Sequence, residues 1–292
     1  MHTHYLLSHT VSALLLLFCV MTNSASAQSQ SVEFRVQGSG NSIVLIPGLM
    51  SDQRVWDETA QFLSKRFQVH LANVAGFGVS KPVNGTNIDK IKGEITTYIE
   101  RNNLGRVILV GHSFGGFLAL SIAVEYPQHV DKVISVDGLP FLAPIFTRNS
   151  ATKADDMLQQ ANMLRQSYSS MNQHQLRQIT ATGLHIQATS NIDQQRVLQM
   201  AEQSDPKTVG TIMAEMLTTD LRMSLKKSSI PILILGASGG FSSASEHSFA
   251  QQLYAQQIEG VVNAKLKMNR FARHFIMFDD AKWLHQQMID FL

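Results

Sequence analysis

The serine at position 113 lies in a sequence context that could make it a nucleophile. Residues 111–115 are Gly-His-Ser-Phe-Gly, a G-x-S-x-G pattern, and they stand between an apolar run at 107–110 and a helical pattern at 114–125. A sharp turn from strand to helix exposes a serine hydroxyl, and side chains two positions away on either side would clash there. The position of the two glycines therefore predicts that Ser113 is reactive.

A serine hydroxyl attacks a carbonyl group only when a positioned base removes its proton, so a histidine is required. Of the 11 histidines, His2, His4 and His9 are N-terminal, which leaves eight candidates. We expect His274 to be the base because it follows a predicted strand and precedes a final amphipathic helical pattern. His112 is expected to support the turn or line the site, and the spacing of the other histidines predicts no metal site.

The elements that must position these residues alternate along the chain, which favours βαβ units and a mostly parallel, doubly wound sheet. Predicted strands are 32–36, 43–46, 69–74, 107–110, 133–136, 232–235 and 264–268, and predicted helices are 55–66, 88–101, 114–125, 245–258 and 280–292. The alternation stops after 136. Residues 139–227 are helical in pattern and rich in Gln and Met, so we expect a helical cap inserted into a core of 28–138 and 228–292. Core packing is the favoured role of its methionines.

These patterns resemble the α/β-hydrolase family over essentially everything after residue 27. Residues 46–49, Ile-Pro-Gly-Leu, resemble the family's H-G-x segment, with Pro where His is usual. Residues 74–80 resemble its D-x-x-G-x-G-x-S loop, with Asn73 where Asp is common, and that loop is structural. His274 with the following Phe resembles its terminal H-F segment. The resemblance implies that the backbone N–H groups of Leu49 and Phe114 form the oxyanion hole.

The resemblance also implies an acid just after the strand at 232–235, yet residues 236–240 are Gly-Ala-Ser-Gly-Gly. Our candidate is Asp137, because its strand should lie between the nucleophile strand and the penultimate strand and end at the same crevice. Asp137 could instead cap the turn that follows it. Glu246 and Asp220 remain alternatives, although Asp220 could also pair with Arg222.

These residues together predict hydrolysis of an ester, thioester or lactone through an acyl-serine intermediate. Acyl transfer to another acceptor and carbon-carbon bond hydrolysis use the same machinery and stay open. A binding protein that keeps the fold without turnover is the alternative from another class. The Met and Leu content of the cap favours a small-molecule substrate with an apolar acyl group. No cofactor or metal is expected, and the sequence sets no expectation for the oligomeric state.

Residues 1–27 contain no charged side chain, carry an apolar run at 11–21 and end in Ala-Ser-Ala. This pattern predicts a cleaved signal peptide and a periplasmic or secreted protein, because the run is too short for a stable membrane anchor. The only cysteine, Cys19, lies in this segment, so the mature chain would have no disulfide, Cys-zinc site or cysteine nucleophile. The net charge of +2 comes from scattered Lys and Arg, which argues against a nucleic-acid partner.

Overall fold

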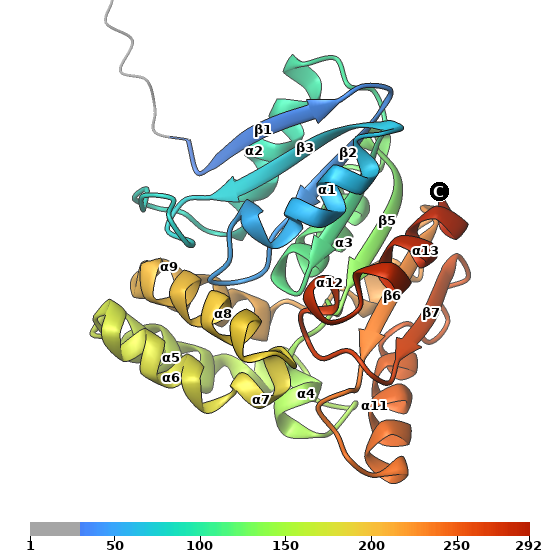
Figure 1. Ribbon diagram of the computed structural model, residues 1–292. Helices are drawn as coiled ribbons and strands as arrows, with labels where there is room; N and C mark the ends of the chain where they lie inside the picture. The colour runs from blue at the N-terminus through green and yellow to red at the C-terminus, as the bar shows by residue number, and fades with distance from the viewer. Residues whose placement is uncertain (1–29) are drawn as a thin grey trace, which may run out of the picture.

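A computed structural model describes residues 30–292, and the predicted signal peptide lies outside them. The described chain forms a seven-stranded sheet in the order β1-β3-β2-β4-β5-β6-β7 (Figure 1). The strands are β1 (Val32–Gly38), β2 (Asn41–Ile46), β3 (Phe67–Val74), β4 (Val107–His112), β5 (Val130–Val136), β6 (Ile232–Ala237) and β7 (Ala264–Asn269). Only β1 pairs antiparallel, with β3. The predicted α/β class with a mostly parallel sheet is confirmed.

Helices cover both faces of the sheet, which explains why its central strands are continuously apolar. The helices α2 (Ile88–Arg101) and α3 (Phe114–Glu125) pack on one face, and α1 (Asp57–Leu63) and α13 (Ala281–Phe291) on the other. In β2, residues 43–46 are fully buried, and alternate side chains belong to the two opposite core clusters. A strand buried on both faces needs apolar side chains at successive positions, as β2 has.

Helices fill the chain between β5 and β6, a segment that we call the cap. In Figure 1 they gather beyond the sheet edge at which β5 leads into α4. They are α4 (Ala143–Thr147), α5 (Leu158–Ser169), α6 (Gln173–Thr182), α7 (Leu184–Gln187), α8 (Asn191–Gln203), α9 (Pro206–Thr218) and α10 (Arg222–Leu225). Met157, Met200 and Met216 are buried in their packing, whereas Met163 and Met223 are exposed. The three buried methionines therefore have a packing role, because a flexible apolar side chain fills irregular gaps in a core.

Two further helices complete the C-terminal part of the core. The helix α11 (Ala244–Gln257) connects β6 to β7, and α12 (Ile276–Asp279) follows the loop that carries His274. Within residues 30–292, no helix combines the length and apolar character that crossing a bilayer would require.

Candidate active site

Ser113 lies in a strained turn between β4 and α3. Its φ and ψ angles are 52° and −115°, a region that non-glycine residues rarely adopt. The flanking glycines leave room for this turn: a Cβ at Gly111 would lie 2.0 Å from the backbone of Gly115, and one at Gly115 would lie 2.3 Å from the Ile46 carbonyl oxygen. The Ser113 N–H donates to the Val136 carbonyl at 2.9 Å, which holds the turn against β5. The turn thus presents a partly exposed serine at the start of a helix.

The carboxylate of Asp137 binds the imidazole of His274. The distance from His274 Nδ1 to Asp137 Oδ2 is 2.6 Å, and the Asp137 side chain is only 8% exposed. The other oxygen, Oδ1, accepts hydrogen bonds from the Ala237 N–H and the Tyr254 hydroxyl, both at 2.7 Å. Because Asp137 holds Nδ1, the second ring nitrogen of His274 is left to act as a base.

Tyr254, on α11, is a buried residue that the sequence reasoning missed. Burial raises the pKa of its hydroxyl well above the ordinary value, and the nearby Asp137 charge raises it further. The hydroxyl therefore stays protonated and donates to Asp137 at neutral pH. No local pattern marks Tyr254, because its partner lies 117 residues away in the sequence.

His112 connects the turn at Ser113 to the loop that carries His274. Its ring is buried, lies 4.6 Å from the His274 ring between centroids, and donates from Nε2 to the His274 carbonyl at 3.1 Å. The residue before Ser113 thus contacts His274, which places both groups at one edge of the sheet. In residues 30–292 the Ser113 hydroxyl makes no hydrogen bond to His274, and such catalytic contacts often tighten only when substrate binds.

His112 should make folding stability depend on pH. Burial is the main cause that lowers its pKa well below the ordinary value, and the neighbouring His274 lowers it further. In the unfolded chain His112 takes up a proton at about pH 6.5, whereas in the folded protein it stays neutral at that pH. The free energy of unfolding therefore falls as the pH drops below that value. We expect His112→Asn to remove up to about 1.4 kcal/mol per pH unit from this dependence between pH 6 and 5.

Urea unfolding of both proteins at pH 5, 6 and 7 measures this difference. His70 and His285 also have pKa values lowered by burial, so part of the dependence should persist in the variant. Equal slopes in the two proteins would contradict the expectation for His112.

The cap holds the loop that carries His274. The His274 N–H donates to the Ile186 carbonyl at 3.1 Å, and the Phe275 N–H donates to the Gln187 carbonyl at 2.9 Å. The Arg273 side chain donates from Nη1 to the Ala188 carbonyl at 2.8 Å. The chain at 186–188 therefore runs beside 273–275, and the position of His274 depends on the cap as well as on the sheet.

Two backbone N–H groups lie beside Ser113 without an acceptor. Phe114 is the first residue of α3, and Leu49 follows Gly48, at which a Cβ would lie 3.3 Å from the Ser113 Cβ. Within the described part of the chain, neither the Leu49 nor the Phe114 N–H donates a hydrogen bond. Free donors next to a nucleophile are what an oxyanion requires.

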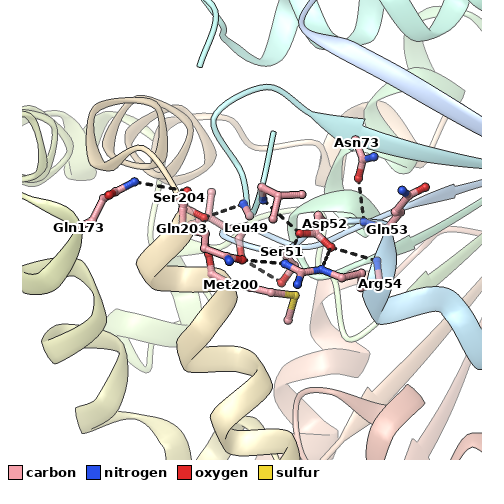
Figure 2. A network of polar contacts seen from close by, with 12 residues as sticks. Leu49, Ser51, Asp52, Gln53, Arg54, Asn73, Gln173, Met200, Gln203 and Ser204 are labelled. Carbon is pink, nitrogen blue, oxygen red and sulfur yellow. Dashed lines mark hydrogen bonds and ion pairs between the residues drawn. The ribbon is translucent and has the colours of Figure 1, made fainter. Parts of the chain in front are cut away.

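An ion pair between the buried Asp52 and the partly exposed Arg54 anchors the loop that contains Leu49 (Figure 2). The Asp52 side chain is fully buried, and its carboxylate accepts from Arg54 Nη2 at 2.6 Å and from the Val79 N–H at 3.2 Å. Arg54 also donates to Gln203 at the end of α8, at 2.8 Å. The network joins the Leu49 loop to a core loop and to the cap, and a fixed loop keeps the Leu49 N–H in place.

Asn73 and Ser204 extend the same network in Figure 2. Asn73, which stands where the resembled pattern has Asp, accepts from the Gln53 N–H at 2.9 Å. Ser204 accepts from the Gly78 N–H at 2.8 Å. Both side chains bind backbone N–H groups, in keeping with the structural role expected for this loop.

The carboxylates of the two alternative acids, Glu246 and Asp220, bind other groups. Glu246 accepts from the Ser243 N–H at 3.0 Å and so caps α11, and Asp220 pairs with Arg222 at 2.7 Å. Neither contacts His274 in residues 30–292. In the same range, no group of three or more His, Cys, Asp or Glu side chains could hold a metal ion.

Comparison with known proteins agrees with this architecture. A family model described as alpha/beta hydrolase fold matches residues 41–178. The chain is 30% identical to a pimeloyl-[acyl-carrier protein] methyl ester esterase of Vibrio cholerae, over 39% of this chain and 44% of that protein. It therefore spans less than half the length of that curated relative. The protein of the same name from Nitrosomonas europaea is 26% identical over 70% of this chain and 79% of its own.

Solved structures extend the likeness to almost the whole described chain. An enol-lactonase from Burkholderia xenovorans superposes with a TM-score of 0.68 at 17% identity, over 89% of this chain and 95% of that one. A thermophilic esterase from Thermogutta terrifontis gives 0.68 at 17% identity, over 89% and 92%. At this identity the superposition speaks for the fold alone. With the matching family model and the sheet order described above, the chain has the α/β-hydrolase fold and is similar to that family.

Proposed function

We propose that this protein is a serine hydrolase that cleaves an ester, thioester or lactone through an acyl-serine intermediate. The observation that supports it most is the 2.6 Å contact between His274 and Asp137, beside a strained serine turn. Relatives named as methyl ester esterases, and a similar fold in an enol-lactonase, support the same class of bond.

In the proposed reaction His274 removes the proton from Ser113 as the hydroxyl oxygen attacks the substrate carbonyl carbon. The negative charge that forms on the carbonyl oxygen is stabilised by the N–H groups of Leu49 and Phe114. His274 then gives its proton to the leaving oxygen or sulfur, and the acyl group stays on Ser113. A water molecule, deprotonated by the same imidazole, releases the acid and restores the serine.

The acyl half of the substrate is proposed to be apolar. Leu49, Met50 and Leu142 are half-buried and pack against the core cluster that contains Phe114. Leu49 follows Gly48, which adjoins Ser113, and Met50 contacts Thr180 of α6, so their partly exposed apolar surface favours burial of a hydrocarbon chain near the nucleophile.

Acyl transfer remains the second candidate, because the free hydroxyl of an alcohol can replace water in the last step. Product analysis with and without added alcohol separates the two reactions. The alternative of a non-catalytic binding protein rested on the missing acid after β6. Asp137, directly after the neighbouring strand β5, offers a carboxylate to His274 instead.

A fluorophosphonate probe tests the nucleophile directly. We expect the probe to label the protein covalently at Ser113, because only an activated serine attacks phosphorus at a useful rate. Labelling should disappear in Ser113→Ala and persist in the matched control Ser80→Ala, on the neighbouring core loop. Labelling that is absent from the parent protein, or undiminished in Ser113→Ala, would rule out this mechanism.

A further inference from the structure

A cavity of about 550 Å³ opens beside His274, between the cap and the β6–α11 part of the core. Its walls gather large apolar side chains that are unusually exposed: Ile145, Ile186, Phe241 and Phe249 are each 40 to 46% exposed. Exposed apolar side chains that cluster around one hollow mark a binding site more often than a bare surface does.

The same cavity carries two arginines without a carboxylate partner. Among residues 30–292, neither Arg148 nor Arg273 forms an ion pair. Arg273 donates from Nη1 to the Ala188 carbonyl, and its Nη2 has no acceptor in this range. Glu246 also lines the cavity, but its carboxylate is held by the Ser243 N–H and hydroxyl at the start of α11. The lining thus combines hydrocarbon surface with guanidinium groups that have free donors, a combination that suits an amphipathic anion.

The position of the cavity relative to the reaction indicates which half of a substrate it would hold. His274 lines it, whereas Ser113, Leu49 and Phe114 do not. In the proposed mechanism His274 protonates the leaving atom, which must come within hydrogen-bond distance of the imidazole. The leaving group therefore emerges on the His274 side, and the acyl group on the side of the oxyanion donors.

We propose that this cavity binds the leaving alcohol or thiol of the substrate, and that this leaving group is an apolar chain ending in a carboxylate or phosphate bound by Arg273 and Arg148. The inference rests on the proposed ester hydrolysis and adds a substrate class to it. The apolar part of the chain covers the exposed Ile and Phe side chains, and the anionic end satisfies the free arginine donors.

Acetate esters that differ only at the far end of a six-carbon alcohol test the proposal. We expect kcat/KM to be about tenfold higher for 6-acetoxyhexanoate and 6-acetoxyhexyl phosphate than for neutral hexyl acetate, because a charge-assisted hydrogen bond contributes about that factor. A trimethylammonium analogue should be the poorest substrate. Comparison of the carboxylate with the phosphate shows which anion the site prefers.

Variants then assign the preference to the arginines. Arg273→Gln and Arg148→Gln should each reduce the ratio of anionic to neutral kcat/KM several-fold, and Arg273→Lys should retain part of it. The Arg148 variant matters because that side chain is exposed and makes no hydrogen bond in the described chain, so its loss should not disturb the His274 loop. Arg101→Gln, on α2, is the remote control and should leave the ratio unchanged. A ratio near one in the parent protein, or one unaltered in both arginine variants, would overturn the proposal.

Binding without turnover separates this proposal from the proposed function. Calorimetric titration of Ser113→Ala with 6-hydroxyhexanoate, 6-hydroxyhexyl phosphate and 1,6-hexanediol requires no catalysis. We expect the anions to bind about tenfold more tightly than the diol, and this difference to shrink when Arg273→Gln is added. If no ester is hydrolysed but this difference is found, the proposed function fails, and what stands is that the cavity binds an anionic apolar chain. If esters are hydrolysed and the three probes bind equally, the proposed function stands and the proposed role of the cavity fails.

Discussion

Replacing His274 with alanine is expected to lower kcat for a short-chain p-nitrophenyl ester by about 10⁶-fold. In the proposed reaction the imidazole removes the serine proton in the first half and activates water in the second, so its loss leaves both steps without a base. Held by Asp137 at 2.6 Å, it is also the only histidine bound to a carboxylate at this edge of the sheet in residues 30–292. Steady-state hydrolysis, followed at 405 nm with correction for spontaneous cleavage, measures the loss.

The matched control is His174→Ala, because His174 is an exposed histidine on α6 of the cap. Its kcat should stay within about twofold of the parent value. Circular dichroism confirms that both variants are folded. Turnover by His274→Ala above about one hundredth of the parent rate would show that another group acts as the base.

Replacing Asp137 with asparagine is expected to lower kcat by about 10⁴-fold with little change in the size of the side chain. The carboxylate accepts from His274 Nδ1 and thereby favours the tautomer in which the other ring nitrogen can accept a proton. An amide can present its N–H₂ group to Nδ1, which favours the wrong tautomer, and it carries no charge to stabilise the imidazolium. The loss should therefore appear in kcat and be smaller in KM.

Asp220→Asn is the control for this prediction, because Asp220 was an alternative acid and pairs instead with Arg222. Its kcat should stay within about twofold of the parent. A large loss in Asp220→Asn together with full activity in Asp137→Asn would exclude Asp137 as the acid. Fluorophosphonate labelling should be slowed in Asp137→Asn but still directed to Ser113, since the oxyanion donors remain in place.

Local patterns predicted most of the elements, because their signals lie within a few residues. The helix expected at 88–101 is α2 (Ile88–Arg101), and the helix expected at 114–125 is α3 (Phe114–Glu125). Asn87 caps α2 by accepting from the Lys90 N–H at 2.8 Å, and Ser113 follows β4 in a turn that the flanking glycines permit. A cap, a strand length and a tight turn depend on neighbouring residues, so they can be predicted before the fold is known.

The contacts of Asp137 could not be predicted from local patterns. Parallel strand order placed β5 between β4 and β6 and so favoured Asp137, but it said nothing of what the carboxylate would contact. The Tyr254 hydroxyl and the Ala237 N–H reach it from positions 117 and 100 residues away in sequence. The contact of Arg54 with Gln203 was missed for the same reason, because it depends on how the cap packs on the core.

The sequence by itself determined the kind of sheet, most of its elements and the tight turn at Ser113, since short-range spacing and hydrophobic periodicity encode backbone shape. Tertiary structure alone decided which side chains meet: Asp137 on His274, Tyr254 on Asp137, and the cap segment 186–188 on the histidine loop. Such pairings require segments far apart in the chain to pack at one edge, and packing depends on the whole set of surfaces rather than on any local pattern.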